Sequence, residues 1–299
     1  MDGHDAAFTV GTRGNRTLVL FDNTHLISID APYTEGGVLL FPNTFIASVK
    51  NLFTEAVNQD KERYRIAAII IDPGHGGKDA GAQGTHTING KKVTVVEKDV
   101  VLKVSQELYA TLRAAYPDKK ILMTRTGDTY PSLDDRTVIA NSVPLRENEA
   151  IVYVSVHANA SFNRNARGYE VWYLTPEYRR DLLGSGGQAN VSLLPIQNAM
   201  LDEEYTKESV MIAESIVAGF KGKFPASFPS RGVKAEQWYV VKKSKMPAVL
   251  VELGFVTNRE DAILLSDPAG LKKFSDAIYT GLKDFITRFE RSGGFIALK

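Results

Sequence analysis

The stretch that decides the fold is "AAIIIDPGHGG", residues 67–77. Its five apolar residues, 67–71, do not alternate with polar ones, which is typical of a strand covered on both faces of a sheet. The run ends in an acid, a proline and a glycine, and then in His75. Gly76 and Gly77 follow, and they would leave room for a metal or a substrate to approach the backbone. The stretch predicts either a buried strand that turns sharply or a strand that delivers a ligand to a site.

The same pattern continues along the chain from residue 65. Further apolar runs without alternation predict strands at 120–124, 150–156 and 248–252. Stripes of apolar residues at helical spacing predict helices at 97–117, 208–224 and 271–289. Alternation of strands and helices predicts an α/β domain over 65–299, with a mostly parallel twisted sheet flanked by helices.

Residues 1–64 have a different pattern. Short strands are predicted at 17–21, 25–30 and 37–41, and an amphipathic helix at 43–59. We therefore expect a small N-terminal β/α extension. A scaffold extension of the main domain and a separate binding module are both open interpretations of this part.

Composition excludes several classes of protein and of site. The formal net charge of +1 gives no reason to expect a nucleic-acid partner, and no apolar run is long enough for a membrane span. The N-terminal sequence shows no signal peptide, although processing could have removed one. The chain has no cysteine, so a metal would be held by its five histidines and by carboxylates.

Four ligand-type side chains fall at one edge of the predicted sheet. His75, His157 and Glu252 follow the carboxyl ends of three strands, and Glu97 opens a helix. Parallel sheets bind ligands at that edge. Two histidines, a glutamate and an open position make a catalytic zinc site, and a further carboxylate can move the proton. Taken singly, each histidine is also compatible with a turn residue, and Glu97 with an acid that stabilises the helix dipole.

Five segments in order resemble the zinc-dependent N-acetylmuramoyl-L-alanine amidases, whose catalytic domain is of the Amidase_3 type. The resemblance covers about residues 65–289. The segments are "DPGHGGKDAGAQG" (72–84), "EKD" (97–99), "SVHAN" (155–159), "SRGVK" (230–234) and "MPAVLVELGFVTN" (246–258). The resemblance implies a peptidoglycan hydrolase that cleaves the amide between the lactyl group of N-acetylmuramic acid and L-alanine of the stem peptide.

The resemblance also implies roles for individual residues. His75, Glu97 and His157 match the ligands of one Zn²⁺ per chain, and Glu252 matches the glutamate that serves as general base and acid toward a zinc-activated water. Two alternatives remain: a zinc peptidase acting on free peptides, and a non-catalytic homologue that binds or regulates at the cell wall.

Other polar residues match positions that are often polar in the family. Arg125, Arg136 and Asn141 could contact substrate or hold the loops by hydrogen bonds, and Asn159 could orient a ligand or the substrate beside His157. His86 matches no family ligand, and a surface loop is the simpler interpretation.

Two segments depart from the family pattern. Residues 84–96 lengthen the connection from His75 to Glu97, and they are typical of a hairpin that turns at Asn89-Gly90. The second departure is an insertion at about 175–209. Some related amidases carry a helix here that plugs the active site, so part of 190–206 could be autoinhibitory. The candidate acids are Asp202, Glu203 and Glu204, and release would need an activator protein; the alternative is a solvated excursion.

A peptidoglycan substrate implies a bacterial location in the periplasm, outside the cell or in the cell wall. This expectation rests on the resemblance alone.

Overall fold

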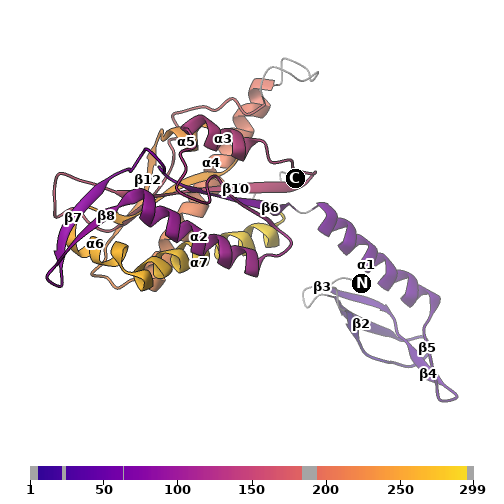
Figure 1. Cartoon of the computed structure of the whole chain (residues 1–299). Coiled ribbons are helices and arrows are strands. Elements are labelled where there is room, and N and C mark those ends of the chain that lie inside the picture. Colours follow the sequence, from indigo (N-terminus) through magenta and orange to yellow (C-terminus); the bar gives the residue numbers. More distant parts are fainter. Residues whose placement is uncertain (1–5, 22–24, 63, 184–193, 295–299) are drawn as a thin grey trace. The chain divides into compact units, whose positions relative to one another are not determined.

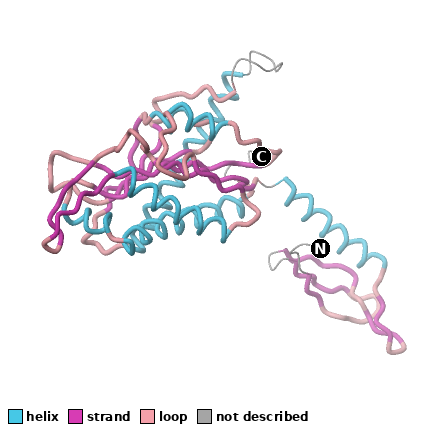
Figure 2. Tube along the Cα trace, viewed as in Figure 1, coloured by secondary structure: helices cyan, strands magenta, loops and turns pink. Residues whose placement is uncertain are grey.

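The computed structural model describes residues 6–21, 25–62, 64–183 and 194–294 (Figures 1 and 2). The chain divides into two compact units, residues 1–63 and residues 64–299. The division falls one residue before the boundary predicted from the change in sequence pattern.

In the smaller unit, a helix packs against a short antiparallel sheet whose strand order is β1-β2-β3. Val19 and Ile29 of the sheet form a small core with Phe45 of the helix, and the rings of Phe21 and Phe53 meet edge to face at 5.0 Å. The elements are β1 (Ala6–Phe8), β2 (Arg16–Phe21), β3 (His25–Asp30), β4 (Tyr33–Glu35), β5 (Val38–Leu40) and α1 (Asn43–Glu62). The predicted strands and helix of this part are therefore present.

A six-stranded sheet forms the centre of the larger unit, in the order β12-β11-β13-β10-β6-β9. The neighbours β13, β10, β6 and β9 are parallel, whereas β11 pairs antiparallel with β13 and parallel with β12. The strands are β6 (Arg65–Pro73), β9 (Lys120–Met123), β10 (Glu149–Asn159), β11 (Tyr169–Leu174), β12 (Ser230–Glu236) and β13 (Ala248–Phe255). The predicted mostly parallel α/β sheet is confirmed.

Helices cover both faces of this sheet, which explains why its central strands do not alternate (Figure 1). In β6, Ile69 and Ile71 pack into the core shared with α2, α4 and α7, whereas Ile70 packs into a second core with α3 and α5. Successive side chains point to opposite faces, so residues 68–73 are all buried. The helices are α2 (Glu97–Ala115), α3 (Leu133–Asn141), α4 (Leu194–Lys223), α5 (Tyr239–Lys243), α6 (Arg259–Ser266) and α7 (Pro268–Ser292).

The two departures from the family pattern have different structures. The predicted hairpin consists of β7 (Gln83–Ile88) and β8 (Lys91–Val96). It turns at Asn89 and Gly90, both of which have positive φ angles, 50° and 74°. In the insertion, residues 194–209 form the first half of α4. The residues of the expected plug before position 194 lie outside the part of the chain that the structure describes.

Candidate active site

The loop that follows β6 is held in place by two buried arginines. Arg136 donates to the carbonyl oxygens of Pro73 and His75, each at 2.7 Å, and forms a 2.7 Å ion pair with Asp72. Arg125 donates to the carbonyl oxygens of Pro73 and Gly74 at 2.9 and 2.7 Å. These contacts fix a turn in which His75 itself has a φ of 57°, a conformation that non-glycine residues rarely adopt.

The Asp72 carboxylate is fully buried within this turn. It accepts hydrogen bonds from Thr124 Oγ1 at 2.5 Å and from Ser155 Oγ at 2.8 Å. Burial raises the pKa of Asp72, but the charge of Arg136 and the hydrogen bonds from Thr124 and Arg136 outweigh it and hold the pKa below its usual value. The pair is therefore charged, and the turn is stabilised by a satisfied buried network.

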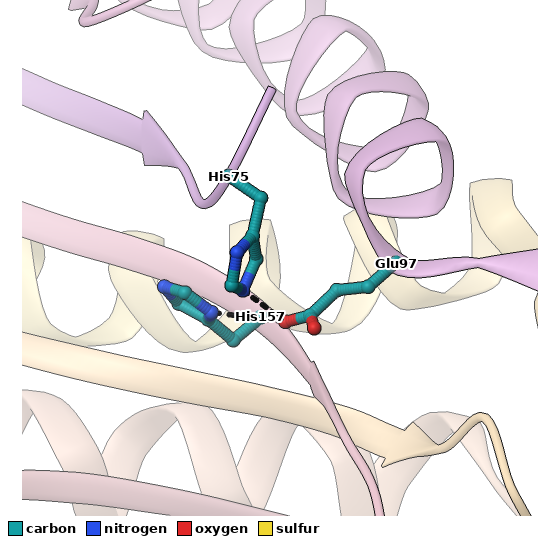
Figure 3. Close-up of side chains that lie close together, drawn as sticks. All are labelled: His75, Glu97 and His157. Atoms are coloured by element: carbon teal, nitrogen blue, oxygen red, sulfur yellow. Dashed lines mark hydrogen bonds and ion pairs between the residues drawn. The ribbon is translucent and has the colours of Figure 1, made fainter. Parts of the chain in front are cut away.

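His75, Glu97 and His157 come from three elements and meet at the carboxyl edge of the sheet, as Figure 3 shows. His75 follows β6, Glu97 is the first residue of α2, and His157 lies near the end of β10. Glu97 Oε1 lies 3.1 Å from His75 Nε2 and 3.0 Å from His157 Nδ1. One ligand atom from each residue lies within 4.8 Å of the other two, so these residues could hold a metal ion.

These separations fit a tetrahedral metal site. Two ligand atoms that each lie about 2.0–2.1 Å from a zinc ion are about 3.3 Å apart in that geometry. His75 also meets a second requirement, because its Nδ1 atom lies 2.8 Å from Asp79 Oδ2. A carboxylate at that position fixes the ring so that Nε2 faces the ion.

The Glu97 carboxylate is fixed by its surroundings. Burial raises its pKa, but hydrogen bonds and attraction from His157 and His75 outweigh burial, so the pKa lies far below its usual value. Its Oε1 atom accepts from the Ala158 N–H at 3.0 Å, and Oε2 accepts from the Ala82 N–H at 2.8 Å. The Glu97 N–H in turn donates to the Ala82 carbonyl at 2.9 Å. This reciprocal pair closes the base of the β7–β8 hairpin.

The glycines that make room for the site are not the ones that the sequence suggested. A Cβ atom on Gly74 would lie 2.2–2.7 Å from the His157 ring, and one on Gly81 would lie 2.6 Å from Glu97 Oε2. At Gly76 and Gly77 the close neighbours are instead Thr129, Arg125 and Tyr130. The expectation that Gly76 and Gly77 leave room for a metal or substrate is therefore wrong: they let the 125–130 segment pack against the turn.

Glu252 lies on β13 directly beside His157, its register partner on β10. It is only 8% exposed, and its Oε2 atom has no hydrogen-bond partner among the described residues. Burial raises the pKa of Glu252 well above its usual value, and the negative charges of Glu97 and Glu170 add to this. A buried carboxylate oxygen without a partner is available to accept a proton.

A cleft of about 420 Å³ is lined by His75, Glu97, His157 and Glu252. Its lining also includes Asn159 and the aromatic side chains Tyr130, Trp238 and Tyr239. The cleft thus combines a group of metal-type ligands, the Glu252 carboxylate with its Oε2 atom unbonded in the described part of the chain, and an aromatic surface. This is the usual composition of a small-molecule site.

The remaining predicted residues differ in their distance from the cleft. Arg136 lines it but is already bonded to the turn. Asn141 bridges α3 to the loop after α5, because its Nδ2 donates to the Lys243 carbonyl and its Oδ1 accepts from the Lys245 N–H. Arg125 and Asn141 are not among the described residues that line the cleft. The observed contacts thus match the loop-holding alternative for both.

Asn159 connects the cleft to a buried carboxylate that the sequence reading missed. Its Nδ2 atom donates to Glu170 Oε1 at 2.8 Å. Glu170 also accepts from Arg231 at 2.7 Å and Lys234 at 2.5 Å, and it pairs in register with Glu252. The available signal was an acid inside the apolar strand "YEVWYL", because such a carboxylate must be paired. Asp79 was also missed, although it stands four residues after His75.

The insertion acids do not lie in the cleft. Asp202 is buried and bonded to Arg180 at 2.6 Å, Glu203 pairs with Lys207 at 2.8 Å, and Glu204 is partly buried. None of the three lines the cleft in the described part of the chain. The Arg180 pair satisfies Asp202, so this acid gives no support to the expected plug. His86 Nε2 lies 2.8 Å from the Val256 carbonyl, which makes it a partly buried hairpin contact rather than a free loop residue.

No helix in the described residues is long and apolar enough to cross a membrane.

A mostly parallel sheet with two histidines and two glutamates in one cleft at its carboxyl edge defines a candidate metal-dependent hydrolase. The chain belongs to the N-acetylmuramoyl-L-alanine amidase family, whose Amidase_3 model matches residues 69–284.

Individual relatives agree with the family assignment. The probable cell wall amidase LytH of Staphylococcus aureus is 28% identical over 229 residues, which are 77% of this chain and 62% of that protein. The chain thus spans less than two thirds of this relative. Among solved structures, amidase AmiC2 of Nostoc punctiforme is 29% identical with a TM-score of 0.54, covering 74% of this chain and 97% of that one. An amidase of Clostridium difficile 630 is 26% identical with a TM-score of 0.55, covering 75% and 98%.

Proposed function

We propose that this protein hydrolyses the amide bond between the lactyl group of N-acetylmuramic acid and L-alanine of the peptidoglycan stem peptide, with one zinc ion. The observation that carries the proposal is the convergence of three ligand atoms in one cleft with Glu252, whose Oε2 atom has no hydrogen-bond partner among the described residues. Membership of the amidase family supports the choice of bond. The substrate implies a periplasmic, extracellular or cell-wall location.

His75 Nε2, Glu97 and His157 Nδ1 would hold the ion, and Asp79 would orient His75. When bound, zinc would supply a Lewis acid for the scissile carbonyl and would lower the pKa of water. Glu252 would accept the proton of that water at its carboxylate and pass it to the leaving alanine nitrogen. Asn159 and Glu170 would keep the floor of the cleft in position beside Glu252.

Removing zinc is expected to abolish hydrolysis. Purified protein is treated with a chelator, its metal content is measured, and release of stem peptides from peptidoglycan is followed before and after stoichiometric Zn²⁺ is restored. Activity should disappear with the metal and return with it. A protein that hydrolyses peptidoglycan equally well without metal would contradict the zinc proposal.

Replacing Asp79 with alanine is expected to weaken zinc binding by about 10- to 100-fold, because the His75 ring loses the carboxylate that orients it. Competition with a chromophoric chelator measures the affinity. Asp276→Ala is the matched control, because this substitution removes the same charge from α7. Among the contacts described, the Asp276 carboxylate pairs only with Lys272. Equal affinities in the two variants would show that Asp79 does not support the metal.

Two other functions predict different products. An amidase leaves the glycan uncleaved and releases intact stem peptides with a free L-alanine amine, whereas a zinc peptidase would cut within the peptide. A non-catalytic homologue would bind peptidoglycan and release nothing. The presence of all four chemical groups in one cleft favours the enzyme.

A further inference from the structure

The cleft contains three aromatic side chains for which the proposed chemistry has no use. Tyr130, Trp238 and Tyr239, here called the aromatic group, line the same cleft as the ligand residues. Tyr130 precedes α3, whereas Trp238 and Tyr239 stand at the start of α5. Two segments more than a hundred residues apart in sequence therefore supply one surface beside the candidate metal site.

Trp238 is partly exposed, and its ring packs against a second tryptophan. It is 40% exposed, and its ring meets the ring of Trp172 edge to face at 5.9 Å between centroids. The Lys234 ammonium lies 4.9 Å from the centre of the Trp172 ring and is paired with the buried Glu170. The indole is thus braced by a chain of contacts while part of its apolar surface stays open, as is typical of a binding residue.

The rest of the aromatic group is also fixed. The Tyr239 hydroxyl donates to the Asp134 carboxylate at the start of α3, so the two segments are tied to each other. The Lys78 ammonium lies 4.7 Å from the centre of the Tyr130 ring. A surface held by its own contacts loses little freedom when a ligand binds, which favours recognition of a rigid group.

The charges of the cleft indicate which part of the substrate this surface receives. Four acids line the cleft: Asp72, Asp79, Glu97 and Glu252. Among its described lining residues, Arg136 is the one lysine or arginine, and it is paired with Asp72. Among the described lining residues, a stem peptide bearing carboxylates finds no lysine or arginine without an acid partner, and the Lys78 ammonium beside the cleft stands over the Tyr130 ring and not over Trp238. An uncharged pyranose ring instead presents an apolar C–H face, which suits an indole, and polar edges, which suit hydroxyl and carboxylate groups.

We propose that the aromatic group, and Trp238 above all, binds the N-acetylmuramic acid ring on the lactyl side of the scissile amide. This inference rests on the proposed function. Trp238 makes the enzyme select sugar-linked peptides over the same lactyl-peptides without the sugar, since binding energy remote from the reacting bond contributes to turnover.

The test compares N-acetylmuramoyl-L-alanyl-D-isoglutamine with D-lactoyl-L-alanyl-D-isoglutamine, which keeps the scissile amide but lacks the sugar. In the zinc-loaded full chain, Trp238→Ala should lower kcat/KM for the first compound by about tenfold and leave that for the second unchanged. Trp238→Phe should restore part of the loss. Phe162→Ala is the control, because Phe162 is fully exposed and is not a cleft-lining residue.

Binding is measured separately from turnover by calorimetry in a Glu252→Gln background, where both compounds remain intact. Tighter binding of the sugar compound that disappears in Trp238→Ala supports the assignment, even if the wild-type protein hydrolyses neither compound and the proposed function fails. Equal binding of the two compounds before substitution, or an equal loss for both compounds after it, would overturn the sugar assignment.

Discussion

Glu252→Gln is expected to lower kcat for amide hydrolysis by about 10²- to 10⁴-fold while zinc content stays at one ion per chain. Glutamine has the shape of glutamate but cannot accept the proton, and Glu252 is not one of the three residues whose ligand atoms converge. The Oε2 atom has no hydrogen-bond partner among the described residues, so the substitution breaks no described hydrogen bond at this atom. Single-turnover release of L-alanyl peptides and elemental analysis of the metal provide the two measurements.

The matched control for this variant is Glu107→Gln, which removes the same charge from an exposed position on α2. It should retain wild-type activity and metal. If Glu252→Gln were as active as this control, the assignment of Glu252 as the proton acceptor would be wrong. Loss of zinc together with activity would show that Glu252 acts by maintaining the metal site.

Arg136→Met is expected to lower the free energy of unfolding by about 3–5 kcal/mol. The substitution leaves the fully buried Asp72 carboxylate without its charged partner and removes the donors that hold the Pro73 and His75 carbonyls. Zinc affinity should fall as well, because His75 follows directly on this turn. Denaturant unfolding and a zinc titration measure the two effects.

Two further variants identify the cause of this loss. Asp72→Asn combined with Arg136→Met should recover much of the stability, because the unpaired buried charge is then absent. Lys207→Met breaks the exposed pair with Glu203 and should leave the unfolding free energy almost unchanged. A single Arg136→Met variant as stable as wild type would refute a structural role for the buried pair.

Much of the fold could be predicted because its signals are local. The runs in β6, β10 and β13 are mostly apolar and do not alternate, because helices cover both faces of the sheet. Parallel strands also place their carboxyl ends at one edge. His75, His157 and Glu252 are therefore close together in the structure. The hairpin was equally local, since Asn89 and Gly90 favour the observed turn.

The rest depended on partners far away in sequence. Pairing direction is not written in a strand, so the reversal of β11 and the position of Glu170 opposite Glu252 could not be foreseen. The insertion acids illustrate the same limit. In the sequence Asp202 is a candidate acid for the active site, whereas in the structure it is bonded to Arg180, 22 residues earlier. The contacts of Asn141 with residues 243 and 245 are likewise invisible in the sequence.

The reciprocal hydrogen bonds between Ala82 and Glu97 make the position of Glu97 independent of the length of the β7–β8 hairpin between them. They hold Glu97 in place whatever number of residues lies between them. The hairpin tip at Gly90 has open space around it. Evolution can therefore lengthen, shorten or replace the tip of this connection without moving the glutamate. Exchange of residues 88–91 is accordingly expected to leave the Glu97 carboxylate in place.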